Sequence, residues 1–374
     1  MARSSDFARR ADQAGGRLIA TLLPRRARPL PERPRRVVVI QPTAIGDTLI
    51  GSATLAAMHR AWPEAELILA HGASNAAAAR MIDAPLTLVE TGFSNPFAAA
   101  RRLKARGPDL AVDLCPWPYA TALAARLSAP AAAGFAPSFG ARGRLFDLAV
   151  PHRTDRHERG NHAALAAALG LTDQPGMAIR RDPAALPADL APERLVLAHV
   201  SAGGARAAAK GWPAEHWVRL ARALADEGWR LGFTGVAADA AQVSPILAAA
   251  GLPEEQAFSL CGRLPLPALA ELLARVPLLI SVDTGVLHLS AAVEGRALGL
   301  HGPTRAARWG SISPRALGLD APHPAAGYIQ YGWEEHPQAA AIMPTLTPGQ
   351  AIAAARELLT MAPRPLAAPR RATA

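Results

Sequence analysis

The chain begins the same pattern twice: a short apolar run, a loop and a helix-compatible stretch. The β-branched run Val37–Ile40 leads through a loop into a helical pattern over residues 47–60. After a polar, proline-bearing segment, the pattern begins again at Leu195–Val200. Apolar strands that alternate with helices form parallel sheets covered on both faces, so we expect an α/β protein with two Rossmann-like domains.

The remaining runs extend both halves of the pattern. The expected strands are 67–70, 86–89 and 110–114 in the first half, and 231–234, a piece near Phe258, 278–282 and 297–300 in the second. The expected helices are 76–81, 96–104, 214–227, 237–250, 267–275, 286–293 and 349–361. We expect a first domain over residues 37–190, a second over 191–348, a separate terminal helix over 349–361 and a cleft between the sheets.

The net charge of +10 lies at the ends of the chain. Residues 1–36 hold ten arginines and three acids, residues 361–374 hold three arginines and no acid, and the part between is balanced. This distribution argues against nucleic-acid binding. It predicts a basic, flexible N-terminal arm (1–36) and a basic tail (362–374). A competing interpretation is that the arm makes peripheral contact with an anionic membrane surface.

The two cysteines, Cys115 and Cys261, have no partners at disulfide or metal-ligand spacing. The apolar run Leu18–Leu23 is too short for a signal-peptide core or a membrane span. We therefore expect a cytoplasmic protein, and attachment through the arm would put it at the cytoplasmic face of a membrane.

A candidate phosphate site is the turn Asp283-Thr284-Gly285, between an apolar run and a helix that contains His288. A helix N-terminus attracts anions, although Asp283 or Thr284 could equally be a structural cap. Aspartic proteases also use Asp-Thr-Gly, but they need two such triplets, and this chain has one.

The loop over residues 201–210 follows the first strand of the second half and contains Gly203, Gly204, Arg206 and Lys210. Glycines allow close approach of the backbone, and a cation can neutralise a diphosphate. This loop and Asp283 are expected at the same edge of one sheet, so Lys210 is a candidate diphosphate ligand. Solvated surface is the competing interpretation of that lysine.

Asp47 ends the first loop of the first half, in Ile45-Gly46-Asp47-Thr48-Leu49. It is either a helix cap or a general base for an acceptor hydroxyl. The loop lacks the dinucleotide fingerprint G-x-G-x-x-G, and the chain has no Walker motif. These absences disfavour a nucleotide-dependent oxidoreductase.

Three segments in order resemble the heptosyltransferase family of lipopolysaccharide core assembly, glycosyltransferase family 9. They are Ile45–Leu49 continued through Trp62-Pro63-Glu64-Ala65-Glu66-Leu67, Lys210-Gly211-Trp212-Pro213, and Ser281–Leu289 followed by His301-Gly302-Pro303-Thr304. The resemblance implies a GT-B fold whose terminal helix crosses back to the first domain. It also implies inverting transfer without a metal or other cofactor, from an ADP-heptose-type nucleotide sugar.

The resemblance also assigns roles to residues. Asp47 is implied as the base, Lys210 as the catalytic diphosphate ligand, and Asp283, Thr284, Gly285 and His288 as the donor-binding turn. Leu264 is implied where the backbone contacts the nucleobase of the donor. Asp239 takes the place where the family usually has a glutamate that holds the nucleoside.

Lipopolysaccharide inner core is anionic, so basic side chains of the first domain are candidate acceptor ligands. They are Arg101, Arg102, Lys104, Arg142, Arg144 and His152. Two other functions stay open: transfer of a different sugar or transfer to a protein or capsular glycan, and non-catalytic binding of a nucleotide sugar or glycan.

Overall fold

The computed structural model describes residues 6–173, 175–187, 190–204 and 206–361. Contacts divide the chain into two compact units after Ala178, earlier than the boundary expected at residue 190. The physical reason is that the connecting segment packs on the second unit. Arg181 forms an ion pair with Glu271 at 3.2 Å, and the amide of Asp182 donates to the carbonyl of Pro267.

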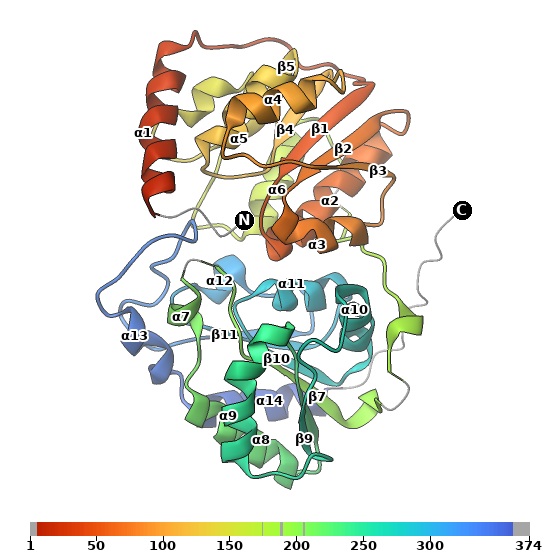
Figure 1. Ribbon diagram of the computed structural model, residues 1–374, viewed down its shortest axis with the longest axis vertical. Helices are drawn as coiled ribbons and strands as arrows, with labels where there is room; N and C mark the ends of the chain where they lie inside the picture. The colour runs from red at the N-terminus through yellow and green to blue at the C-terminus, as the bar shows by residue number, and fades with distance from the viewer. Residues whose placement is uncertain (1–5, 174, 188–189, 205, 362–374) are drawn as a thin grey trace. The chain divides into compact units, whose positions relative to one another are not determined.

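The first unit is built on a parallel sheet with the strand order β3-β2-β1-β4-β5-β6 (Figure 1). Its strands are β1 (Arg36–Gln41), β2 (Glu66–His71), β3 (Leu86–Glu90), β4 (Leu110–Asp113), β5 (Ala131–Ala136) and β6 (Leu148–Pro151). Its helices are α1 (Asp6–Leu22), α2 (Ile45–Ala61), α3 (Ala76–Met81), α4 (Pro96–Lys104), α5 (Tyr119–Ser128) and α6 (Glu158–Ala168), with short 3-10 turns η1 (Ala73–Asn75) and η2 (Arg142–Leu145).

Alternation along the strands gives this sheet two apolar faces. In β1, Val38 and Ile40 pack with residues of α4 and α5, whereas Val37 and Val39 pack with residues of α2, α3 and α6. Since successive side chains of a strand point to opposite faces, a continuous apolar run is what a doubly covered sheet requires.

The second unit repeats this arrangement with the order β12-β11-β10-β7-β8-β9. Its strands are β7 (Leu195–His199), β8 (Arg230–Phe233), β9 (Ala257–Ser259), β10 (Leu278–Val282), β11 (Ala297–His301) and β12 (Ala316–Asp320). Its helices are α7 (Ala207–Lys210), α8 (Ala214–Asp226), α9 (Ala240–Ala250), α10 (Leu266–Arg275), α11 (Gly285–Ala292), α12 (Ala306–Trp309), α13 (Ala339–Ile342) and α14 (Pro348–Thr360), with 3-10 turns η3 (Pro183–Ala185), η4 (Pro192–Arg194), η5 (Ala237–Asp239) and η6 (Met343–Thr345).

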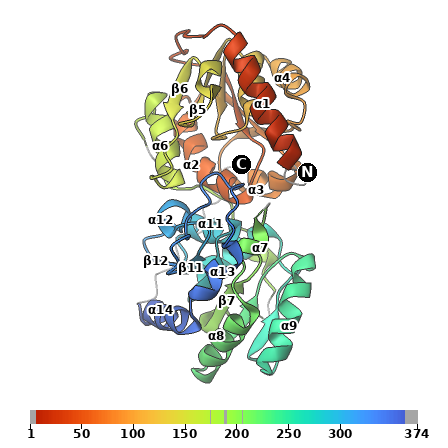
Figure 2. The same cartoon turned by 90° about the vertical axis from the view of Figure 1, so that its left-hand side faces the viewer.

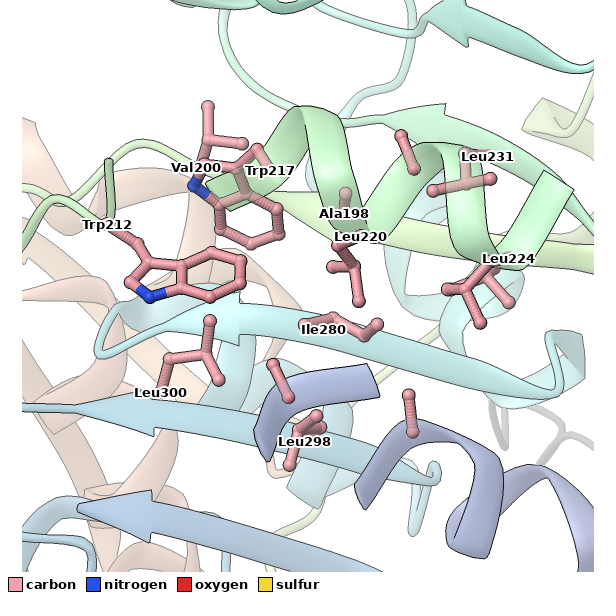
Figure 3. Close-up of a cluster of buried hydrophobic side chains, with 14 of the residues drawn as sticks. Ala198, Val200, Trp212, Trp217, Leu220, Leu224, Leu231, Ile280, Leu298 and Leu300 are labelled. Atoms are coloured by element: carbon pink, nitrogen blue, oxygen red, sulfur yellow. The ribbon is translucent and has the colours of Figure 1, made fainter. Parts of the chain in front are cut away.

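The core of the second unit is anchored by two tryptophans (Figure 3). Trp212 and Trp217 are buried with ring centroids 5.0 Å apart in an edge-to-face arrangement. The indole N–H of Trp212 donates to the carbonyl of Leu346 at 2.7 Å, which ties the start of α8 to the segment before α14. The buried Trp212 therefore fixes the position of the Lys210-Gly211-Trp212-Pro213 segment.

The prediction of two Rossmann-like α/β domains is confirmed. Three strands were not predicted: β5, β6 and β12. The strand β5 reads Ala-Ala-Ala-Gly-Phe-Ala, and alanine and glycine have low strand propensity. Its pairing with β4 and β6 supplies what the local sequence lacks.

Most of the expected flexible arm is ordered. Residues 6–22 form α1, whose Asp12 accepts hydrogen bonds from the amides of Tyr119 and Ala120 at the start of α5. Gly16 lies so close to Tyr119 that a Cβ atom there would be 2.2 Å from the tyrosine Cβ. This close approach, which only glycine permits, explains how an arginine-rich segment packs on the first unit. The expected basic tail, 362–374, lies outside the described residues.

The terminal helix α14 packs on the core of the second unit. Ala351, Ala354, Ala355 and Leu358 on one of its faces join the core formed by the second sheet and α8. Within the described part of the chain, no helix is long and apolar enough to cross a membrane.

Candidate active site

Two central loops of the second unit meet at the carboxyl edge of its sheet. The loop over residues 201–210 follows β7, and the turn 283–285 follows β10, which pairs with β7. The connections leave β7 and β10 in opposite directions across the sheet, toward β8 and toward β11. Such a switch point is where open α/β sheets bind ligands.

Lys210 and Asp283 form an ion pair at this point. The Lys210 Nζ lies 2.7 Å from Asp283 Oδ2, and both side chains are largely buried. Burial alone would raise the pKa of Asp283, but Lys210, and then His301 and His288, lower it to about 2. The aspartate therefore stays ionised and holds the lysine at the sheet edge. Because its pKa is lowered, the ionised carboxylate stabilises the folded protein at pH values above 3.8, the ordinary pKa of aspartate. This contribution is lost as the pH falls toward 2.

Thr284 is the N-cap of α11. Its hydroxyl accepts a hydrogen bond from the amide of Val286 at 3.0 Å, so the capping interpretation of this residue is correct. Gly285 begins the helix, and His288 is buried one turn further along. The N-terminal end of α11 thus lies beside the Lys210–Asp283 pair and adds a positive dipole end to it.

A further residue of this site, His301, was part of the family-like segment but had received no role. It ends β11, is fully buried, and has its Nδ1 3.5 Å from the hydroxyl of Thr304. Its influence on the pKa of Asp283 puts it in the same electrostatic cluster. In the sequence, the signal that could have identified His301 was its position directly after the apolar run 297–300. Within the described residues, no group of three or more His, Cys, Asp or Glu side chains could hold a metal ion.

Asp239 and Leu264 lie on neighbouring loops of the same sheet edge. Asp239 follows β8, and its carboxylate accepts from the amide of Val236 at 2.8 Å. The loop of Leu264 follows β9 and is joined to the Asp239 loop by a hydrogen bond from the Gly262 amide to the Gly235 carbonyl. The structure therefore brings together the expected diphosphate and nucleoside residues on one edge of one sheet.

Arg206 fixes the loop that carries Lys210. Its guanidinium donates to the carbonyls of Trp333 at 2.9 Å and Glu334 at 3.2 Å, and pairs with the Glu335 carboxylate at 2.7 Å. The loop is thereby tied to the segment between β12 and α13.

In the first unit, Asp47 lies in the first turn of α2, directly after β1. Its Oδ2 accepts a hydrogen bond from the amide of Ala44 at 3.0 Å, and the residue is half-buried. The carboxylate thus closes the turn at the carboxyl edge of β1. The neighbouring strand β4 ends there with Asp113, followed by the buried Cys115. Burial and the charge of Asp113 raise the pKa of this thiol.

The six expected acceptor ligands do not form one group. Arg101, Arg102 and Lys104 are exposed in the last turn of α4, and the Arg106 carbonyl just beyond accepts from the Arg36 side chain at the start of β1. They therefore lie toward the amino edge of the sheet, opposite to Asp47. Arg144 is exposed and donates to the Ala20 carbonyl of α1 at 3.1 Å. His152 is buried after β6 with its Nε2 2.9 Å from Glu158.

Arg142 is a correction to the expectation, because it is fully buried and structural. Its guanidinium pairs with Asp113 at 2.5 Å, and it also donates to the carbonyls of Pro118 and Phe135. Burial raises the pKa of Asp113, and the arginine opposes that shift. The pair joins the end of β4 to the turn η2, out of reach of an acceptor.

We expect Arg142→Met to destabilise the protein by about 3 kcal/mol, because it leaves the Asp113 carboxylate buried without its cation. Chemical unfolding would measure the loss. Arg144→Met, two residues away at an exposed position, is the matched control; it removes one hydrogen bond, to the Ala20 carbonyl, and should cost no more than about 1 kcal/mol. Equal losses in both variants would contradict a structural role specific to Arg142.

Comparison with known proteins agrees with this geometry. Residues 97–327 match the family model of glycosyltransferase family 9 (heptosyltransferase). The chain is 35% identical over 98 residues to lipopolysaccharide heptosyltransferase 2 of Escherichia coli, covering 26% of this chain and 28% of that protein. Over 118 residues it is 33% identical to lipopolysaccharide heptosyltransferase 1 of Pseudomonas aeruginosa, covering 31% of this chain and 32% of that protein. These alignments span less than a third of the curated relatives.

Solved structures extend the likeness to the whole fold. A family 9 glycosyltransferase of Veillonella parvula superposes with a TM-score of 0.68 at 20% identity, covering 88% of this chain and 98% of the other. The ADP-heptose lipopolysaccharide heptosyltransferase II of E. coli gives 0.67 at 20% identity, covering 87% and 98%. The fold is therefore GT-B, as expected. Together with the family match over most of the chain, it follows that this protein belongs to glycosyltransferase family 9, the heptosyltransferase family.

Proposed function

We propose that the protein is an inverting, metal-independent glycosyltransferase that moves a heptose from an ADP-heptose-type donor to a lipopolysaccharide core acceptor. The observation that carries this proposal is the buried Lys210–Asp283 pair beside the N-terminal end of α11. A cation and a helix N-terminus converge there, and a nucleoside diphosphate is the anion that a switch point of an α/β sheet accommodates. Solved relatives include an E. coli heptosyltransferase with ADP and one with ADP-2-deoxy-2-fluoro heptose.

In the proposed reaction, an acceptor hydroxyl attacks the anomeric carbon while the bond from that carbon to the diphosphate oxygen breaks. Positive charge grows on the anomeric carbon and negative charge on the departing ADP. Lys210 and the first turn of α11 stabilise the diphosphate. Asp47 takes the proton from the acceptor hydroxyl, and attack from the face opposite to the leaving group inverts the centre.

The remaining residues of the second unit give the donor its orientation. Asp283 keeps Lys210 in place, and His288 and His301 add to the electrostatic cluster around it. The loops of Asp239 and Leu264 are the proposed contacts for the nucleoside and its base. The acceptor is an anionic glycolipid, so we propose that the protein works at the cytoplasmic face of the inner membrane.

Nucleotide preference tests the donor class. We expect ADP to raise the thermal midpoint, and UDP, GDP and NAD to have much smaller effects at the same concentration. A ligand at a hundred times its Kd stabilises by about 2.7 kcal/mol, a shift of several degrees for a domain of this size. The shift should be much smaller in Lys210→Met, which removes the diphosphate ligand. A response to NAD alone would overturn the assignment.

A further inference from the structure

Helix α1 has two opposite faces, and only one is used within the first unit. On the inner face Gly16 and Ala20 are buried against the first unit. On the outer face, Phe7, Leu18 and Leu22 are 81%, 61% and 74% exposed. At 100° per residue these three side chains fall on one stripe, on the side of the helix opposite to Gly16 and Ala20. Large apolar side chains gathered in this way need an explanation that scattered ones do not.

The outer face is held in a fixed orientation. Asp12 is bonded to two amides at the start of α5, the side chain of Gln13 donates to the Trp117 carbonyl at 3.3 Å, and Arg144 donates to the Ala20 carbonyl. Figure 2 shows α1 in red along the outside of the first unit. These contacts fix the inner face of α1 on the first unit, so the side chains of the stripe point away from it.

Positive charge borders the stripe. Arg10 and Arg17 are exposed on one side of it, and Arg25 is exposed just after the helix ends. The two carboxylates of α1 are engaged elsewhere, Asp6 with Arg9 at 3.2 Å and Asp12 with α5. An apolar stripe edged by arginines is the pattern of a helix that lies in the interface of an anionic bilayer.

We propose that the outer face of α1 docks the protein on an anionic phospholipid surface, with Phe7, Leu18 and Leu22 in the headgroup boundary and Arg10 and Arg17 against lipid phosphates. This deepens the proposed function, since a glycolipid acceptor is presented at such a surface. Docking itself needs neither donor nor acceptor. A second copy of the chain is a poorer occupant. A stable interface buries about 1,200–2,000 Å², far more than three side chains offer.

The test is co-sedimentation of the full chain with vesicles of phosphatidylcholine alone, and with vesicles that also contain phosphatidylglycerol. We expect binding only with the anionic lipid, weakening as salt is added. The variant Phe7→Ser/Leu18→Ser/Leu22→Ser should lose at least about tenfold in partitioning, and Arg10→Gln/Arg17→Gln should reduce the preference for phosphatidylglycerol. The matched control, Phe97→Ser/Ile312→Ser/Met361→Ser, changes three exposed apolar side chains elsewhere and should bind like the wild type.

Every outcome bears on the proposal. Binding of the α1 triple variant equal to wild type would overturn it, as would absence of binding to anionic vesicles by the wild type. A wild type that is dimeric in solution and a triple variant that is monomeric would assign the face to self-association instead. Because lipid binding is measured without substrates, failure of the ADP experiment would leave this result untouched, and the reverse also holds.

Discussion

Replacing Lys210 by methionine is expected to lower kcat/KM about 10³-fold. Methionine keeps much of the apolar stem but removes the cation that meets the departing diphosphate in the proposed reaction, and one preorganised group of this kind is worth about 10²–10³ in rate. The affinity for ADP should fall as well, because ground state and transition state share this contact. Steady-state turnover of ADP-heptose and direct titration with ADP would measure both effects.

Stability must be separated from catalysis in this variant, since Lys210→Met leaves Asp283 buried without its partner. The double variant Lys210→Met/Asp283→Asn removes both charges and should recover most of the lost stability without recovering turnover. Arg356→Met, which breaks the more exposed pair with Glu227, is the control for loss of an ion pair in the same unit. Turnover within tenfold of wild type in Lys210→Met would contradict the diphosphate role.

Asp47→Asn is expected to lower kcat about 10²–10⁴-fold while leaving ADP affinity unchanged, because a positioned base acts on the acceptor and not on the nucleotide. The substitution distinguishes the role of Asp47 as a general base from its role as a helix cap. An asparagine oxygen can still accept from the Ala44 amide, so the unfolding free energy should stay within about 0.5 kcal/mol of wild type.

The matched control for Asp47 is Glu90→Gln. Glu90 is an exposed carboxylate that ends β3, at the same edge of the same sheet. It should retain turnover. If Asp47→Asn also kept near-native turnover, Asp47 would be a helix cap and no more, and the proton would have to leave by another route.

The pattern of apolar residues predicted most of the fold, because a strand that is buried on both faces of its sheet consists almost entirely of apolar residues. Val37–Ile40 is a continuous apolar run, Leu278–Val282 is interrupted only by Ser281, and both are central strands. The helix α1 was not predicted, because the ten arginines of residues 1–36, together with their glycines and prolines, are typical of a flexible segment. Its stability comes from Gly16 against Tyr119 and from Asp12 on the start of α5, contacts with residues about a hundred positions away.

The proposed donor site was more predictable than the proposed acceptor residues. Lys210 and Asp283 each follow a central strand, so topology alone brings them to one sheet edge. Charge alone carries no such information. Arg142 and Arg144 are two residues apart in one short 3-10 turn, yet one is sealed beneath the surface with Asp113 and the other is exposed. Only the direction of each side chain in the folded turn decides this, and no spacing rule encodes it.

The strand order described for both sheets has a consequence for how the chain acquires its structure. The central pairs join distant residues: Val37 is registered with Leu110, and Val196 with Leu278. Each sheet must therefore close long loops before its middle is complete, which makes folding slow. Synthesis proceeds from the N-terminus, so the first sheet can be completed while the second is still being made. The division after Ala178 therefore also separates two stages of folding during synthesis. Once the chain up to Ala178 has left the ribosome, the first unit has all the strands and helices of its core and can fold before the second unit is complete.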